Sequence, residues 1–150
     1  MEDIVEQTIT DSEIARLSKA HEESKGSGGE AELVARFQYA HALLRSVHTQ
    51  DIRHGVSLME RLYYEGNKSQ RRDYLYYIAI GQTRLKQYKL ALDCVEDFLQ
   101  FERQNRQATN LRAYIKEKLT KDGLMGMAIT GGAVLAIGGL IGLGMSLAKK

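Results

Sequence analysis

The sequence has no proline and a single cysteine, and each shortage narrows the structures it can form. Cys94 has no second cysteine to pair with, so the chain has no disulfide framework, which fits a domain in the reducing cytosol. Proline interrupts helices more strongly than any other residue. Without it, apolar residues recur at spacings of three and four, and no segment alternates like a strand. We therefore expect an all-α protein.

The chain before Gly123 also lacks an excess of charge of either sign. It contains all 19 acidic residues and all but two of the 21 lysines and arginines, Lys149 and Lys150 being the exceptions. A balanced charge disfavours a polyanion-binding function. The first ten residues, MEDIVEQTIT, have no apolar core behind a basic flank, which argues against a secretory signal or an Arg-rich transit peptide.

Motifs for catalysis are missing as well. The sequence contains no GxxxxGK[ST], GxSxG or HExxH motif. The four histidines show no metal-ligand spacing; they are His21, His41, His48 and His54. We therefore expect a protein that is not an enzyme and uses neither a cofactor nor a metal.

The longest uncharged run lies at the C-terminus, over 123–148, and is closed by Lys149 and Lys150. As a helix rising about 1.5 Å per residue, it would be roughly 39 Å long and exceed the hydrocarbon core of a bilayer, about 30 Å. The run is rich in glycine, which helices tolerate far better in lipid than in water. The sequence predicts a transmembrane tail anchor with a basic tail at 149–150. Gly138 and Gly142 have GxxxG spacing, which would permit a homo-oligomer.

Ahead of this anchor we expect an N-terminal arm at 1–10 and one helical domain at 11–122. Thr10 and Glu13 have the spacing of a capping box, and Lys25 to Gly29 reads as a flexible loop. The second helix has an apolar face too broad for packing on one side only. The predicted architecture is a six-helix bundle, with helices near 11–25, 30–48, 51–65, 71–85, 88–101 and 105–119.

Short turns between these helices suggest stacked antiparallel pairs, and the segment 73–100 fits the tetratricopeptide pattern without gaps. Ala79 and Ala91 take the small positions at which two helices approach closely. The chain departs from the pattern at Phe98 and, just after the segment, at Arg103. A looser copy at 37–62 places Ala40 and Gly55 at the small positions, with extra residues in its turn. Two tandem repeats flanked by unlike helices make physical sense, because isolated repeats leave an apolar face open.

Five segments in order carry a resemblance to a known family. They are FQYAHALLRS at 37–46, DIRHG at 51–55, RDYLYYIAIG at 72–81, RLKQYKLAL at 84–92 and KDGLMGMAITGG at 121–132. Together they resemble the mitochondrial fission protein family, the small tail-anchored adaptors of the outer mitochondrial membrane.

The resemblance implies a cytosolic domain whose concave face recruits a dynamin-related GTPase, its adaptors or its regulators. It also implies a role in dividing mitochondria, and often peroxisomes. The sequence departs from the family pattern at Arg103, and at Gln82 and Thr83 beside the expected groove.

The candidate partner-binding residues lie on the helices that would line the concave face. Aromatic side chains with polar tips beside an arginine suit peptide capture. The fourth predicted helix offers Tyr76, Tyr77, Ile80 and Arg84 at spacings of three and four, and the second offers Tyr39 and Leu43 with Arg36 near one end. An alternative interpretation places Tyr39, Leu43 and Ile80 in the core between the repeats. Assigned to the core outright are Leu33, Phe37, Ile78, Ala79, Ala91 and Val95.

Three further expectations concern the arm, the alternative function and the targeting residues. Ile4, Val5 and Ile9 in the arm need apolar surroundings, and the groove would supply them. A tetratricopeptide receptor for chaperones or preproteins is the alternative function, but a carboxylate clamp needs several Lys and Asn side chains, whereas this face offers mainly Tyr, Ile and one Arg. Lys149 and Lys150 are the candidate targeting residues.

Overall fold

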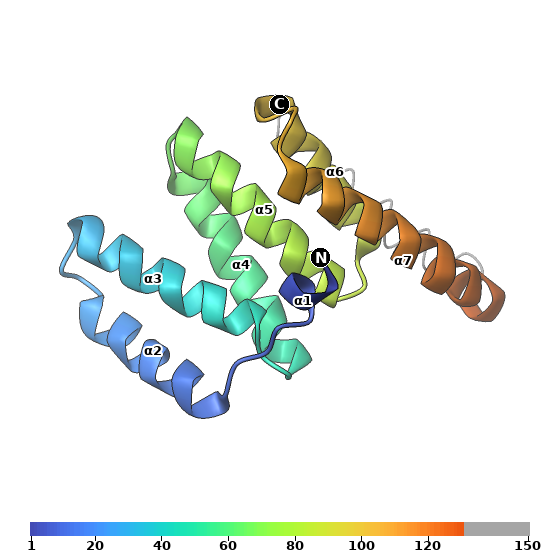
Figure 1. The fold of residues 1–150 in the computed structure, drawn as a ribbon. Helices are drawn as coiled ribbons and strands as arrows, with labels where there is room; N and C mark the ends of the chain where they lie inside the picture. The colour runs from blue at the N-terminus through green and yellow to red at the C-terminus, as the bar shows by residue number, and fades with distance from the viewer. Residues whose placement is uncertain (131–150) are drawn as a thin grey trace.

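The computed structural model describes residues 1–130, with side chains described to Asp122. Its helices are α1 (Glu2–Val5), α2 (Asp11–Ser24), α3 (Gly29–Leu44), α4 (Thr49–Glu65), α5 (Lys68–Arg84), α6 (Tyr88–Phe101) and α7 (Arg106–Thr130) (Figure 1). No strand occurs in this part of the chain, so the predicted all-α class is confirmed. The prediction of six helices was wrong by one, because α1 forms a single short turn inside the predicted arm.

Local hydrogen bonds decide where the helices begin and end. The predicted cap of α2 is present, since the Thr10 hydroxyl accepts from the Glu13 amide at 3.3 Å. The structure starts α5 at Lys68 rather than at the predicted residue 71. Asn67 and Gln70 form a reciprocal capping box there, with bonds of 3.0 and 3.2 Å. Asparagine is common at both the start and the end of helices, so the sequence pattern alone does not show that Asn67 caps α5.

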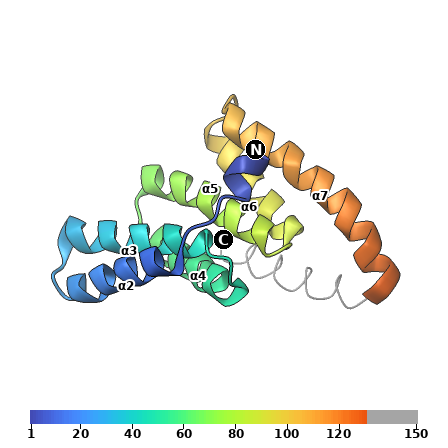
Figure 2. The ribbon, with the colours of Figure 1, turned by 60° about the horizontal axis from the view of Figure 1, so that its bottom comes forward.

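Consecutive helices pack on one another from α2 to α7. The odd-numbered helices α3, α5 and α7 lie along one face, and α4 and α6 lie behind them (Figures 1 and 2). This is the stacked arrangement expected of tandem helix pairs. The core between the pairs contains Ala40, Ala79 and Ala91, each fully buried, so the predicted small positions are contact points.

The turns of the two pairs differ in length. Residues 45–48 connect α3 to α4, and residues 85–87 connect α5 to α6, so the first pair carries the extra turn residue that its looser pattern predicted. The shorter turn is a Schellman motif, in which the Lys86 amide donates to the Thr83 carbonyl and the Gln87 amide to the Gln82 carbonyl. Lys86 takes the left-handed conformation, with φ of 61°, that glycine usually supplies.

The predicted tail anchor falls mostly outside the described residues. Its positions 123–130 continue α7 as helix, while the remainder, including Gly138, Gly142, Lys149 and Lys150, is not described. Within residues 1–130, no helix has both the length and the hydrophobicity needed to cross a bilayer. The anchor therefore stays a prediction of the sequence.

Candidate partner-binding groove

A cavity of about 550 Å³ opens on the face formed by α3 and α5, near the junction of α6 with α7. Helix α3 contributes Leu33, Val34 and Phe37, and α5 contributes three tyrosines. The full lining is Glu30, Leu33, Val34, Phe37, Gln38, Gln70, Asp73, Tyr74, Tyr76, Tyr77, Phe98, Glu102, Asn105 and Gln107. We call this cavity the open half of the groove.

Its floor is a cluster of aromatic rings. The Phe37 ring meets Tyr77 edge-on at 5.3 Å and lies 6.0 Å from Tyr74, measured between ring centroids. Tyr76 lies 5.9 Å from both Tyr77 and Phe98. Beside them, Leu33 and Val34 are 38% and 46% exposed, so apolar surface is available to a partner. Such a concave, aromatic-lined surface is well suited to burying the apolar side chains of a peptide.

A second cavity, of about 220 Å³, adjoins the first, and Tyr76, Tyr77 and Gln107 line both. The remaining lining residues of this second cavity, which we call the covered half, are Ile4, Gln7, His41, Leu44, Arg45 and Ile80. Burial lowers the pKa of the His41 imidazole, which packs edge-on against Tyr77 at 5.2 Å. His41 is therefore a packing residue of the groove.

The N-terminal arm lies over this covered half. Ile4 and Gln7 line the cavity, Val5 is buried in the hydrophobic core, and the Ile9 amide donates to the Arg45 carbonyl at 3.1 Å. A bond of 3.2 Å from the Tyr114 hydroxyl to Glu6 attaches the arm to α7. Burial, together with the Glu6 carboxylate, raises the pKa of Tyr114 to about 12. The structure thus places one apolar residue of the arm, Ile4, in one half of the groove, and another, Val5, in the core.

The candidate residues read from the sequence divide into two groups. Tyr76, Tyr77 and Ile80 line the groove, and their role in partner binding stays a prediction. Leu43 is 1% exposed and belongs to the core, which is the alternative that the sequence left open. Tyr39 lies on another side of α3, where its ring stacks on His21 of α2 at 5.3 Å and meets His54 of α4 at 5.7 Å. These two side chains line neither half of the groove.

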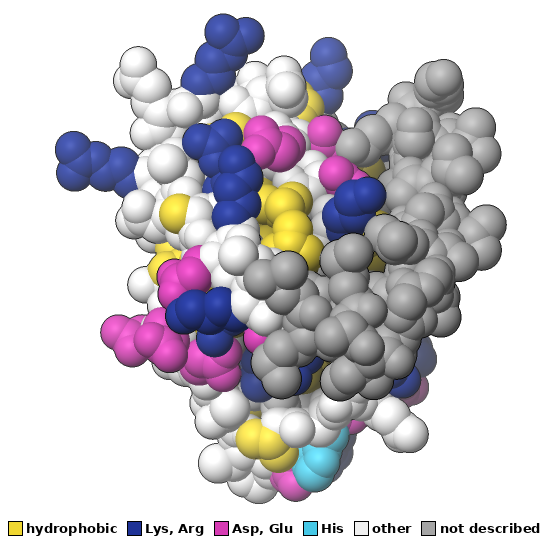
Figure 3. All heavy atoms as spheres, turned by 90° about the vertical axis from the view of Figure 1, so that its right-hand side faces the viewer, with side chains coloured by type: hydrophobic (Ala, Val, Ile, Leu, Met, Phe, Trp, Pro, Cys, Tyr) yellow, Lys and Arg dark blue, Asp and Glu magenta, His cyan; other side chains and the backbone are white. Residues whose placement is uncertain are grey.

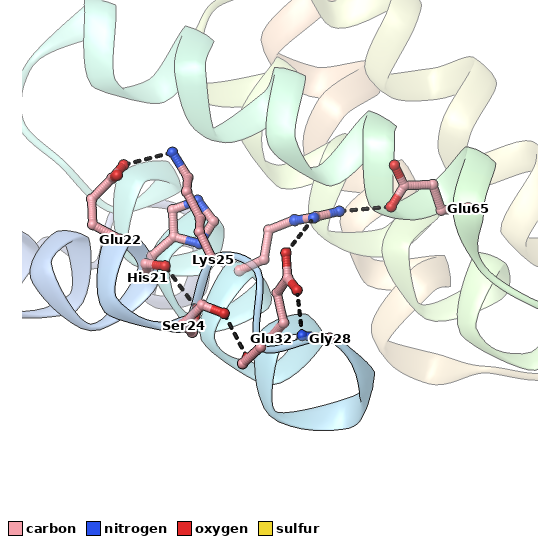
Figure 4. Close-up of polar contacts among 9 residues, drawn as sticks. His21, Glu22, Ser24, Lys25, Gly28, Glu32 and Glu65 are labelled. Carbon is pink, nitrogen blue, oxygen red and sulfur yellow. Dashed lines mark hydrogen bonds and ion pairs between the residues drawn. The ribbon is translucent and has the colours of Figure 1, made fainter.

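Both arginines of the predicted site make contacts within the fold. The Arg84 guanidinium is partly buried and donates to the Leu44 carbonyl at the end of α3, and burial lowers its pKa. Arg36 donates to Glu65 of α4 at 2.6 Å and lies 3.5 Å from Glu32 (Figure 4). Arg84 is partly exposed but lines neither half of the groove, because its guanidinium contacts a carbonyl 40 residues away in sequence that helical spacing cannot identify.

Replacing Arg84 with alanine should therefore reduce stability. The change removes a charged donor from a carbonyl at a helix end, and we expect the free energy of unfolding to fall by about 1 to 3 kcal/mol. Urea denaturation of the full chain in detergent measures this fall. Arg61→Ala is the matched control, since Arg61 is exposed on α4, and it should change the midpoint little. Equal midpoints for the two variants would contradict a structural role for Arg84.

Both helix pairs of the groove match models of a known protein family. Residues 35–66 match the family model of the Fis1 N-terminal tetratricopeptide repeat, and residues 72–124 match that of the Fis1 C-terminal tetratricopeptide repeat. The human mitochondrial fission 1 protein is 39% identical over 151 aligned residues, covering 100% of this chain and 99% of the human protein. The chain belongs to the mitochondrial fission protein family. Members of this family are tetratricopeptide-repeat adaptors and not enzymes.

Two solved structures of yeast Fis1 are similar in fold to this member of the mitochondrial fission protein family. One contains yeast Fis1 with an Mdv1 fragment. Its TM-score is 0.72 and its sequence identity 28%, and the match covers 79% of this chain and 91% of the yeast Fis1 chain. The other contains yeast Fis1 with a fragment of yeast Caf4. Its TM-score is 0.55 and its sequence identity 29%, and the match covers 61% of this chain and 91% of the yeast Fis1 chain.

The groove also contains residues that sequence reasoning misplaced or missed in this fission-family chain. Leu33 and Phe37 were assigned to the core but line the open half, and Val34 and Tyr74 were not singled out. The unusually broad apolar face of the second predicted helix was the available clue, because apolar surface beyond one packing face must meet something else. Gln82 and Thr83 were expected beside the groove but are 7% and 4% exposed, within the helix packing.

The side of the domain along α7 differs in character from the groove. Figure 3 shows basic and acidic side chains interspersed there around a small hydrophobic patch. Neighbouring charges of opposite sign give no extended field that would attract a polyanion. Among residues 1–130, no group of three or more His, Cys, Asp and Glu side chains is placed to hold a metal ion. The groove is therefore the candidate functional site.

Proposed function

We propose that this chain is a tail-anchored adaptor that recruits the division machinery of mitochondria through its concave groove. The observation that carries the proposal is the open, aromatic-lined cavity on the two matched repeats. It is supported by yeast Fis1, a relative of the same fold that has been crystallised with fragments of Mdv1 and Caf4. The partners in this proposal are a dynamin-related GTPase, its adaptors or its regulators.

In this proposal the protein is located in the outer mitochondrial membrane, with residues 11–122 in the cytosol and 123–148 as the anchor. A share on peroxisomes and a homo-oligomer joined through Gly138 and Gly142 belong to the same proposal. A chaperone or preprotein receptor is the competing function. It is disfavoured by the lining of the open half, which includes no lysine and a single asparagine, where a carboxylate clamp needs several cationic donors.

Rescue of mitochondrial shape tests this function directly. In cells lacking their own fission adaptor, the full chain should restore short mitochondria and recover division proteins from detergent extracts. The chain truncated after Asp122 keeps the described groove but should restore neither, because it has no anchor. Full rescue by the truncated chain would contradict the need for an anchor. If the cells lacking their own adaptor showed a loss of preprotein import and no change in mitochondrial length, that result would favour the receptor function.

The basic tail, Lys149 and Lys150, should determine which membrane the protein is inserted into. A moderately apolar, glycine-rich span flanked by lysines favours insertion into the outer mitochondrial membrane. We expect replacement of Lys149 and Lys150 by glutamate to redirect the protein to the endoplasmic reticulum. Fluorescence microscopy of the tagged protein measures this, with a double Arg variant as the control that retains both charges. Mitochondrial location of the Glu variant would overturn the targeting role of the two lysines.

Deleting residues 1–9 should change partner affinity without unfolding the domain. The arm covers one half of the groove and forms only the short helix α1, so its removal exposes Ile80 and Arg45 while leaving α2 to α7 in place. Calorimetry with a recovered partner measures the affinity, and circular dichroism measures the helix content. Equal affinity with and without the arm would exclude a regulatory role for it.

A further inference from the structure

The two halves of the groove differ in charge. The open half is lined by three carboxylates, those of Glu30, Asp73 and Glu102, and its lining contains no lysine, arginine or histidine. The covered half has the opposite charge, since Arg45 lines it and no carboxylate does. Charge along the groove therefore changes sign between the two cavities, near the shared residues Tyr76 and Tyr77.

One cation outside the lining offsets part of the negative charge. Arg72 lies 3.3 Å from Asp73 and 2.9 Å from Glu102 and contacts both carboxylates. One guanidinium cannot neutralise three carboxylates, and the Asp73 side chain is still 58% exposed. Glu30, on the first turn of α3, is exposed as well. The open half thus keeps a negative field over an apolar floor.

The arm shows what kind of segment fits the covered half. It carries three carboxylates, Glu2, Asp3 and Glu6, and no lysine or arginine within residues 1–9. The Glu6 charge acts on the Arg84 guanidinium, and Ile4 and Gln7 line the cavity beside Arg45. An acidic amphipathic segment of the chain itself therefore covers the half that is lined by the cationic Arg45. By the same complementarity, the acidic half requires a segment of opposite charge.

We propose that the open half binds a cationic amphipathic segment of the partner. Apolar side chains of that segment pack on Leu33, Val34 and the aromatic floor, and its lysines or arginines face Glu30, Asp73 and Glu102. The Tyr76 hydroxyl is buried without a hydrogen-bond partner in the described residues, and its ring lines the groove where the two halves meet. This inference rests on the proposed function and specifies the chemistry of the partner.

Selection from a displayed library of random 16-residue peptides on the full chain in nanodiscs tests the inference. We expect enrichment of peptides in which two or more Lys or Arg flank a stripe of apolar residues. Their affinity should fall at least tenfold between low salt and 0.5 M salt, because exposed charges are screened. On Glu30→Lys/Asp73→Lys, the same peptides should lose at least tenfold in affinity, and acidic peptides should be enriched instead.

The outcomes separate this inference from the function on which it rests. Selected peptides that compete with the recovered partner but have no charge bias, or an acidic one, would overturn the cationic segment and leave partner binding in the groove intact. Failure of every selected peptide to compete with that partner would overturn both. Glu96→Lys/Asp93→Lys is the control, because these carboxylates are exposed on α6 and absent from the groove lining; it should leave the selection unchanged.

Discussion

Replacing Gly55 with alanine is expected to destabilise the domain, although the same change in most helices is stabilising. Alanine normally gains up to about 1 kcal/mol over glycine in a helix interior. At Gly55, however, a Cβ would lie 2.9 Å from the Leu43 Cβ, 2.9 Å from the Leu44 amide nitrogen and 3.0 Å from the Ala40 carbonyl oxygen. Because two of these atoms are backbone, helices α3 and α4 must move apart. We expect a net loss of about 1 to 3 kcal/mol in the free energy of unfolding.

Urea denaturation of Gly55→Ala beside Ser57→Ala measures this loss. Ser57 is exposed on the same helix, so Ser57→Ala should show only a small gain from helix propensity. Ala79→Leu should resemble Gly55→Ala, since Ala79 is fully buried between the paired helices. A Gly55→Ala variant more stable than the native chain would show that α3 and α4 are not packed as closely as described.

The second large effect concerns partner binding. Changing Leu33 and Val34 together to glutamine removes exposed apolar surface from the open half without adding charge. Burying one such side chain is worth about 1.5 to 3 kcal/mol, so we expect the affinity for a recovered partner to fall at least tenfold. Stability should change little, because both side chains are partly solvated. Calorimetry measures the affinity and urea denaturation the stability.

Val47→Gln provides the matched control for this loss. Val47 is 62% exposed and lies outside the groove lining, in the turn between α3 and α4. Its replacement removes a comparable apolar side chain from the surface. If Val47→Gln weakened the partner as much as the groove variant, the loss would reflect general surface hydrophobicity and not a defined site.

Helices were easiest to predict where local pattern and packing agree. The α6 bounds, Tyr88–Phe101, matched the prediction because the repeat pattern places its start and its small and bulky contacts together. The predicted start of α5 was wrong, because the Asn67 side chain caps this helix although asparagine is also common at helix ends. At the end of α3, Ser46 donates from its amide to Leu43 and from its hydroxyl to Asp51, which closes the helix before the predicted residue 48.

The site was harder to predict than the fold, for a physical reason. Helical spacing identifies which side chains share a face, but it does not say which neighbouring helix covers that face. Leu43 and Leu33 lie on one helix at apolar positions, yet one is 1% exposed and the other 38%. Arg84 and Tyr76 share a face of α5, yet the arginine contacts a carbonyl of α3 while Tyr76 lines the groove. Only the packing of distant segments separates these cases.

Amide chemical shifts of the isotope-labelled full chain, titrated with a recovered partner, test the central claim most directly. Binding in the groove predicts that the largest changes fall on its lining, at Val34, Tyr74 and Gln107, with smaller changes on the arm. Largest changes instead at Leu99, Arg103 and Arg112, which line a separate cavity formed by α6 and α7, would contradict the groove as the site of recruitment.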